Sequence, residues 1–197
     1  MEKKIKTPRP YLSYSQLTLW ERNPELYREV YIFGRSLLPN EAMLLGREFD
    51  ELIETDEKSK GVWELLRVLV PREPKMQYEL RANADGIPLL GKLDSFNPFT
   101  AQKIVREYKT GKTAWTQKLA DRSTQLTFYA FLAFLKYGHI PKLYLHWCPV
   151  SDGGLTGEVK TFETHRGMRD FLALYGRIEK AWIGIQEMSK VETRTKQ

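Results

Sequence analysis

The chain has 197 residues, of which 42% are hydrophobic and 12% aromatic, a composition typical of a folded globular protein rather than a disordered one. It carries 31 lysine and arginine residues against 25 aspartate and glutamate residues, and this net charge of +6 favours a polyanionic partner. The single cysteine, Cys148, excludes an intrachain disulfide and a cysteine-ligated zinc or iron–sulfur site. No run approaches the roughly eighteen apolar residues of a membrane helix, and the first ten residues lack a signal-peptide hydrophobic region. We therefore expect a cytoplasmic protein with no membrane partner.

A basic tail of ten residues opens the chain and precedes three predicted helices. Ser13 with Gln16 three residues later is typical of a capping box, which predicts the start of a short first helix. A second short helix is expected over 25–32. A stronger amphipathic helix is expected over 41–56, with Asn40 as its N-cap.

The helix over 41–56 contains a glycine in its interior, Gly46, at a cost of about 1 kcal/mol relative to alanine. Asp50 follows one turn later, so the missing side chain leaves open space over this carboxylate. The alternative is that Asp50 and Glu54 belong to a solvated acidic face with no further role. The helix pattern alone favours that alternative.

A hairpin lies at the centre of the predicted fold. After a helix over 60–70, a strand over 77–84 leads into hairpin strands over 87–96 and 102–109, joined by a turn at 97–100. These segments predict three consecutive antiparallel strands.

Charged side chains gather at one end of this hairpin. Glu107 and Lys109 point to the same face of their strand because side chains alternate, and Asp94 lies on the partner strand. Two half-buried carboxylates repel each other unless a cation lies between them, and hard oxygen ligands suit Mg²⁺ or Mn²⁺. Lys109 could then bind a phosphate oxygen or polarise a water. The alternative is an ordinary surface hairpin with a weak ion pair.

The next predicted helix runs from about residue 121 to a glycine stop at Gly138 and is apolar on nearly all sides. Gln125 and Tyr129 are polar positions within it, one turn apart on the same face. Buried polar groups need partners. A site that carries water, metal or phosphate would supply them.

Two further strands, over 142–148 and 155–162, precede a final amphipathic helix over 165–187. We find neither an internal repeat nor a linker long enough to separate two domains. The expected organisation is therefore one domain over 11–188 between a basic tail at 1–10 and a charged tail at 189–197. Its expected fold class is α/β, with a mixed central sheet flanked by helices.

Four short motifs follow one another on the expected types of element. They are Gly46-x-x-x-Asp50 on a helix, Gly91-Lys92-Leu93-Asp94 and Glu107-Tyr108-Lys109-Thr110-Gly111 on strands, and Gln125-x-x-x-Tyr129 on a helix. In this order they resemble the motifs of the PD-(D/E)XK nuclease superfamily, in its RecB-like branch, over about residues 11–137. The lead-in Ser13-Tyr14-Ser15 also matches that branch.

Three departures from the branch are evident. Leu93 replaces the proline that names the superfamily, and Asp50 stands where the branch usually has histidine. The chain also lacks the four cysteines of the iron–sulfur subset.

The resemblance implies a restriction-endonuclease-like core and a set of metal ligands. Asp94 and Glu107 would bind the metal, with the backbone carbonyl of Tyr108 beside them. Whether Asp50 takes the ligand role of the usual histidine stays open.

The resemblance also implies the remaining catalytic residues. Lys109 would be the catalytic lysine, and Gln125 and Tyr129 would position DNA or the general acid–base network. The predicted function is a deoxyribonuclease that hydrolyses phosphodiester bonds with water activated by Mg²⁺ or Mn²⁺. By resemblance we expect an exonuclease of DNA recombination, repair or processing.

The expected partner is DNA, single- or double-stranded, and a protein partner or a second copy of the chain is left open. One alternative is a catalytically inactive nucleic-acid-binding protein on a nuclease scaffold, for which the Asp50 departure argues. Another is a structural module with a fortuitous motif. Retention of Asp94, Glu107, Lys109 and Gln125 together speaks against both.

Overall fold

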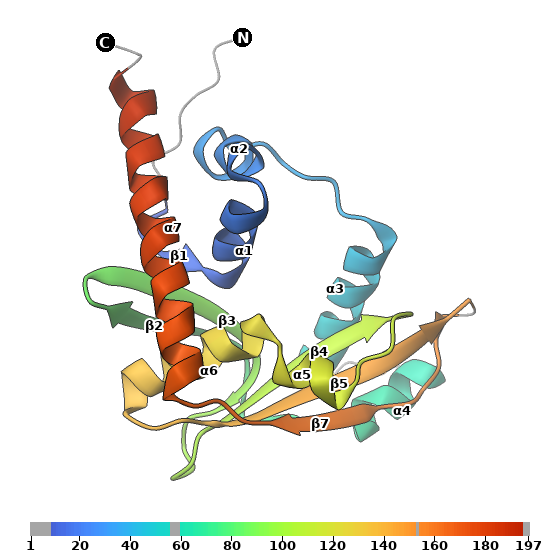
Figure 1. Cartoon of the computed structure of the whole chain (residues 1–197). Helices are drawn as coiled ribbons and strands as arrows, with labels where there is room; N and C mark the ends of the chain where they lie inside the picture. The colour runs from blue at the N-terminus through green and yellow to red at the C-terminus, as the bar shows by residue number, and fades with distance from the viewer. Residues whose placement is uncertain (1–8, 56–59, 153, 195–197) are drawn as a thin grey trace.

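The computed structural model describes residues 9–55, 60–152 and 154–194, with the backbone alone described for 191–194. These residues form an α/β architecture in which a mixed seven-stranded sheet is flanked by helices (Figure 1), which confirms the predicted fold class. The strands are β1 (Leu12–Ser13), β2 (Lys75–Ala84), β3 (Ile87–Asn97), β4 (Ile104–Gly111), β5 (Lys142–Ser151), β6 (Gly154–Leu155) and β7 (Lys160–Thr164). The helices are α1 (Tyr14–Arg22), α2 (Pro24–Tyr27), the π-helix η1 (Arg28–Ile32), α3 (Glu41–Glu54), α4 (Val62–Leu69), α5 (Gln117–Asp121), α6 (Thr124–Tyr137) and α7 (Met168–Arg194).

Strand pairing combines antiparallel and parallel neighbours. β2, β3 and β4 pair antiparallel in chain order, as the sequence predicts. β4 then pairs in parallel with β5, and α5 and α6 form the crossover between them that a parallel pair requires. β7 pairs antiparallel with β5, and the short β1 lies parallel to β3. The antiparallel strands and the crossover helix together position the site described below.

The predicted helix starts are confirmed by their caps. The Ser13 hydroxyl accepts a hydrogen bond from the Gln16 backbone N–H at 3.4 Å, and the Asn40 side chain accepts one from Met43 at 2.9 Å. The capping box itself is only half formed, because Oε1 of Gln16 accepts a hydrogen bond from the Tyr27 hydroxyl, at 3.0 Å, and not from the backbone N–H of Ser13. At the end of α6, Gly138 adopts a left-handed conformation with φ of 77°, as its position after the last apolar turn predicts.

The structure differs from the prediction in two boundaries and in one additional strand. The strand expected over 155–162 is divided into β6 and β7, because the chain turns at Gly157, whose φ is 82°. β1 was not predicted, since two residues carry no periodic signal. The last helix runs to Arg194, well past its expected end near residue 187, so most of the predicted charged tail is helical. Residues 1–8 and 195–197 of the two predicted tails lie outside the described residues.

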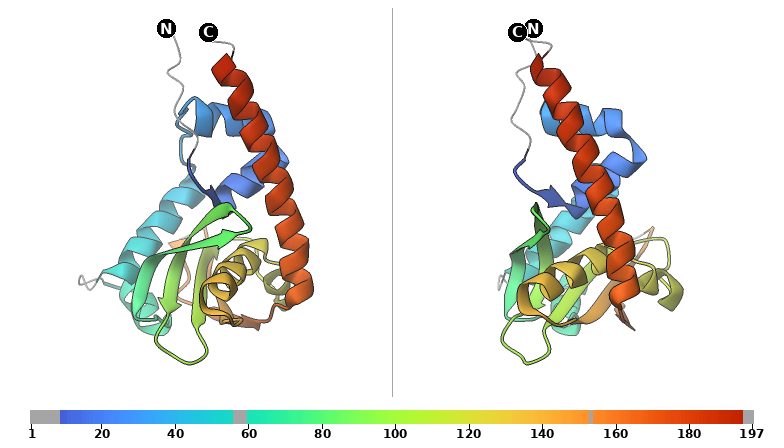
Figure 2. Two further views of the ribbon diagram at one scale, coloured as in Figure 1. Left: turned by 90° about the vertical axis from the view of Figure 1, so that its left-hand side faces the viewer. Right: turned by 60° about the vertical axis from the view of Figure 1, so that its left-hand side comes forward.

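Apolar side chains form two separate clusters. The larger cluster packs α1, α6 and α7 against the sheet, around residues such as Leu93, Val105 and Phe128. The smaller cluster lies under α3 and α4, around Phe49 and Ile53. Helices therefore cover both faces of the sheet, as the turned views in Figure 2 also show. Within the described ranges, none of the helices combines the length and apolar character needed to cross a bilayer.

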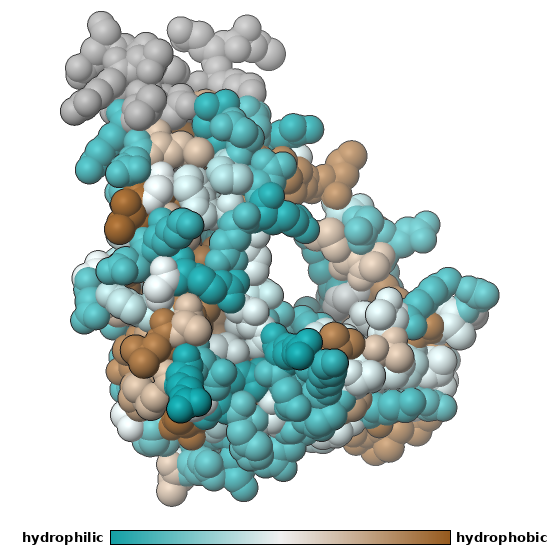
Figure 3. Space-filling model, viewed as in Figure 1, coloured by the Kyte–Doolittle hydropathy of each residue, from teal (hydrophilic) through white to brown (hydrophobic). Residues whose placement is uncertain are grey.

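The molecule has an opening between two of its parts. α1, α2 and α7 rise from the sheet on one side and α3 rises on the other, and the segment 33–40 joins them above (Figures 1 and 3). The space-filling view shows that side chains do not fill the gap between these parts.

Candidate active site

The predicted site lies where β3 and β4 separate. Their paired positions end at Ser95, which lies opposite Arg106, and β4 continues instead along β5. Beyond that point the backbone N–H of Tyr108 donates to Oδ2 of Asp94 at 2.9 Å, in place of a strand-to-strand hydrogen bond. The carboxylate of Asp94 is therefore held in the fork between the two strands.

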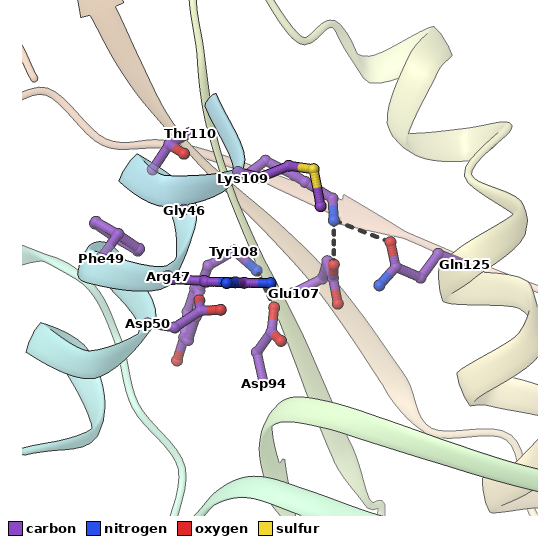
Figure 4. Close-up of a pocket in the computed structure, with 11 residues that line it drawn as sticks. Gly46, Arg47, Phe49, Asp50, Asp94, Glu107, Tyr108, Lys109, Thr110 and Gln125 are labelled. Atoms are coloured by element: carbon purple, nitrogen blue, oxygen red, sulfur yellow. Dashed lines mark hydrogen bonds and ion pairs between the residues drawn. The ribbon is translucent and has the colours of Figure 1, made fainter. Parts of the chain in front are cut away.

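A cavity of about 360 Å³ opens at this fork (Figure 4). Its walls come from α3, β3, β4 and α6. They include six of the seven residues that the sequence predicts for the site: Asp50, Asp94, Glu107, Tyr108, Lys109 and Gln125. The seventh, Tyr129, lies beside the cavity, where its hydroxyl accepts a hydrogen bond from Nε2 of Gln125 at 3.0 Å.

Lys109 is held by two acceptors. Its ammonium donates to Oε1 of Glu107 and to Oε1 of Gln125, the latter at 2.9 Å (Figure 4). Burial by itself lowers the pKa of Lys109, but the charge and hydrogen bond of Glu107 outweigh it, so the net shift is upward. Lys109 is therefore a fixed cation at the cavity wall and not a base.

The buried Glu107 and the half-buried Asp94 form a pair of carboxyl groups. Glu107 is 1% exposed, and its Oε2 has no hydrogen-bond partner among the residues that the structure describes. Burial and, after it, the charge of Glu107 raise the pKa of Asp94 well above its ordinary value. An unpartnered buried carboxylate oxygen is destabilising, so this position is suited to a bound cation.

Asp50 lies on the wall of the cavity that α3 forms. It is half-buried rather than part of an open acidic face, and burial followed by the charge of Glu107 raises its pKa to about 6. The three carboxyl groups of Asp50, Asp94 and Glu107 surround one cavity without closing on a common point. Within the described part of the chain, no three Asp, Glu, His or Cys side chains are arranged to hold a metal as they stand.

Glycine occupies two of the motif positions, 46 and 91, for different structural reasons. A Cβ at Gly91 would lie 2.5 Å from Leu132 and 3.1 Å from the Tyr129 ring, so glycine is what allows α6 to pack this close to β3. A Cβ at Gly46 would meet only Thr110 Oγ1, at 3.9 Å. Gly46 is therefore not required by packing, and its open space belongs to the cavity, as the sequence predicts.

The buried polar pair predicted on α6 finds its partners. Gln125 contacts Lys109, and the Tyr129 hydroxyl donates to the backbone carbonyl of Lys92 at 2.7 Å. A continuous chain of hydrogen bonds thus links β3 through α6 to the lysine on β4. The sequence analysis missed a charged residue of the cavity, Arg47 on α3, whose side chain points into the cavity (Figure 4). Its place three residues before Asp50, on the same helix face, is the signal that could have found it.

No protein-family model and no curated protein matches the sequence of this chain. Among solved structures, a candidate exonuclease from Eubacterium rectale superposes with a TM-score of 0.64 at 11% sequence identity, over 93% of this chain and 82% of that one. A second structure, SSO0001, gives a TM-score of 0.49 at 14% identity, over 89% of this chain and 78% of that chain. The first of these likenesses shows that the two chains share a fold.

Proposed function

We propose that the protein is a metal-dependent deoxyribonuclease of the PD-(D/E)XK type that hydrolyses phosphodiester bonds of DNA. The observation that carries this proposal is the placement of Asp94, Glu107 and Lys109 around one cavity at the fork of β3 and β4, with Gln125 fixing the lysine. The shared fold with a candidate exonuclease supports it. We also propose that it acts as an exonuclease.

The residues at the cavity fit a hard divalent cation. The donor set is made of carboxylates, and Glu107 offers a buried oxygen without a partner in the described residues. Asp94 and Glu107 would hold Mg²⁺ or Mn²⁺, together with the carbonyl of Tyr108 and the carboxylate of Asp50. Such a cation supplies Lewis-acid stabilisation of the negative charge that develops on the phosphate.

The protein's own groups supply binding and orientation. The Lys109 ammonium would donate to a phosphate oxygen, where charge increases as water forms a new P–O bond and the bond to the sugar oxygen breaks. Gln125 keeps this ammonium directed at the cavity, and Tyr129 anchors Gln125 to the backbone of β3. These contacts fix the lysine before a substrate binds, so little reorganisation is needed during the reaction.

Cleavage of labelled single- and double-stranded DNA in Mg²⁺, Mn²⁺ or EDTA tests this function. The wild-type protein is expected to cleave with either metal and not in EDTA. Asp94→Asn keeps an acceptor for the Tyr108 N–H and is expected to abolish cleavage while it preserves the fold. Asp152→Asn, which changes an exposed carboxylate at 99% side-chain exposure, is the matched control and should retain activity. Unchanged cleavage by Asp94→Asn would refute the proposal.

A second candidate is a nucleic-acid-binding protein without catalysis. It is favoured by the absence, within the described ranges, of a closed three-ligand group at the cavity. The two candidates differ in metal binding, which can be measured because an ion that binds the folded state raises the melting temperature. Binding to DNA with neither a Mn²⁺-dependent thermal shift nor cleavage would favour the second.

A further inference from the structure

A second cavity of about 290 Å³ adjoins the catalytic one. Gln125 lines both cavities, and the hydrogen-bonded Tyr129 lines the second. The remaining walls come from β2 and β3, from the first residues of α1 and from the segment that leads into α1. Their polar and aromatic residues include Tyr11, Ser13, Tyr14, Ser15 and Lys92.

Planar and cationic groups are stacked at the outer wall of this cavity. The Tyr11 ring has the guanidinium groups of Arg9 and Arg81 at 5.9 Å and 5.7 Å from its centroid. An unpaired nucleic-acid base stacks on aromatic rings and on guanidinium planes, whatever its sequence. The one carboxylate on this wall, Glu79, is paired with Arg81 at 3.1 Å, so it does not leave the wall acidic.

Groups that can bind a phosphate also line the second cavity. Lys92 is exposed, and the hydroxyl groups of Ser13 and Ser15 lie 3.1 Å apart. Gln125, which lies on the wall between the two cavities, holds Lys109 on one side and the Tyr129 hydroxyl on the other. The two cavities are thus neighbouring parts of one surface.

The arrangement of elements gives this surface a direction. α3, which lines the first cavity, and α1, whose first residues line the second, lie on opposite sides of the opening in Figure 1. A strand whose scissile phosphate lay at Lys109 would pass Gln125 and enter the second cavity.

We propose that the second cavity is a subsite that binds one unpaired nucleotide of single-stranded DNA, next to the scissile phosphate. The position of this nucleotide next to the scissile phosphate rests on the proposed function. The binding of the single strand to the second cavity does not. A single strand is required because the faces of a base in duplex DNA are covered by its neighbours and cannot stack on Tyr11. The cations Arg81 and Lys92 would neutralise the flanking phosphates.

Binding can be measured without cleavage, with a 5′-fluorescent (dT)20 in EDTA and fluorescence anisotropy. Tyr11→Ala is expected to raise the dissociation constant roughly tenfold, because it removes one stacking interaction. Tyr11→Trp keeps an aromatic face and should bind (dT)20 with an affinity close to that of the wild-type protein. Arg81→Gln changes an exposed strand residue and should weaken binding about threefold, with a smaller dependence on salt.

Matched controls come from an aromatic–cation pair at the β3–β4 turn. Phe99 is 70% exposed, and the Lys75 ammonium lies 5.7 Å from its ring centroid. Phe99→Ala and Lys75→Gln should change the affinity for (dT)20 by less than twofold. A blunt 20-bp duplex should bind equally to wild-type protein and to Tyr11→Ala.

The possible outcomes separate this proposal from the proposed function. Selective loss of (dT)20 binding in the Tyr11 and Arg81 variants supports the subsite, even if no DNA is cleaved under any condition. Equal affinities for the subsite and control variants overturn it, even if the protein is an active nuclease. Failure of the wild-type protein to bind (dT)20 overturns it as well. Equal loss of duplex binding in Tyr11→Ala would refute the single-strand preference.

Discussion

Lys109 is the residue on which the electrostatics of the cavity at the β3–β4 fork depend. Among the described residues it is the one lysine on the wall of this cavity, and its ammonium is held by Glu107 and Gln125. A cation fixed in this way can stabilise a developing charge more in the transition state than in the ground state.

Replacement of this lysine should therefore slow turnover more than it weakens binding. Lys109→Ala is expected to lose about 2–4 kcal/mol of transition-state stabilisation, by analogy with the removal of one electrostatic donor. DNA affinity should fall far less, since many basic residues share that term. Lys112→Ala, which removes an exposed lysine near the same end of β4, is the control and should leave kcat unchanged. A pure loss of affinity in Lys109→Ala would make this lysine only a phosphate anchor.

Gln125 acts through Lys109 and is a positioning residue. Gln125→Ala removes one of two acceptors of a charged donor, a contact worth about 1.5–3 kcal/mol, so kcat should fall roughly 10- to 100-fold. Gln125→Glu restores an acceptor and should recover much of this loss, which a purely structural role for the residue would not explain. Kinetics that separate kcat from KM provide the measurement, and a change confined to KM would contradict the assignment.

At the scale of elements, the sequence predicts most of the site and little of its geometry. Caps, apolar stripes and the β3–β4 turn are local signals, so α1, α3, α6 and the hairpin could be predicted. The fork that opens the cavity could not, because β4 leaves β3 to pair with β5, about 40 residues later in the chain. Asp50 likewise has a surface-like pattern within its helix and is half-buried only because the sheet lies beneath it. Tyr11 carried no signal, because its stack with Arg81 joins distant segments.

The packing of α7 on α1 depends on one glycine. A Cβ at Gly184 would lie 2.5 Å from the Trp20 ring, whereas a Cβ at Gly176, two turns earlier in α7, would meet no atom of the described residues within 4 Å. Gly184→Ala should therefore destabilise the protein by about 1–3 kcal/mol through overpacking. Gly176→Ala should stabilise it by roughly 0.5–1 kcal/mol, because alanine is the better helix former. Urea denaturation measures both, and a Gly184→Ala variant as stable as Gly176→Ala would show that α7 does not pack on Trp20 in solution.

At the scale of the whole molecule, the cavity lies between two layers of unequal size. β3, β4 and α6 belong to the larger apolar cluster or border it, whereas α3 is attached through the smaller cluster around Phe49 and Ile53. The segment 33–40 connects α3 to α2 and η1 across the opening (Figure 1). α3 should therefore open locally at lower free energy than α6, as elements with few buried apolar contacts do.

A cation bound by Asp50 as well as by Asp94 and Glu107 would link α3 to the sheet. Opening of α3 would then require release of the ion, so Mg²⁺ at 100 times its dissociation constant should slow amide hydrogen exchange in α3 up to about a hundredfold. Exchange in the exposed half of α7 should not change, which provides an internal control. In Asp50→Asn the ion should still bind to the sheet, as a thermal shift would show, but the protection of α3 should be lost. If the wild-type protein binds Mg²⁺ and amide hydrogen exchange in α3 does not slow, Asp50 is not a ligand. The cation is then bound only by residues of β3 and β4.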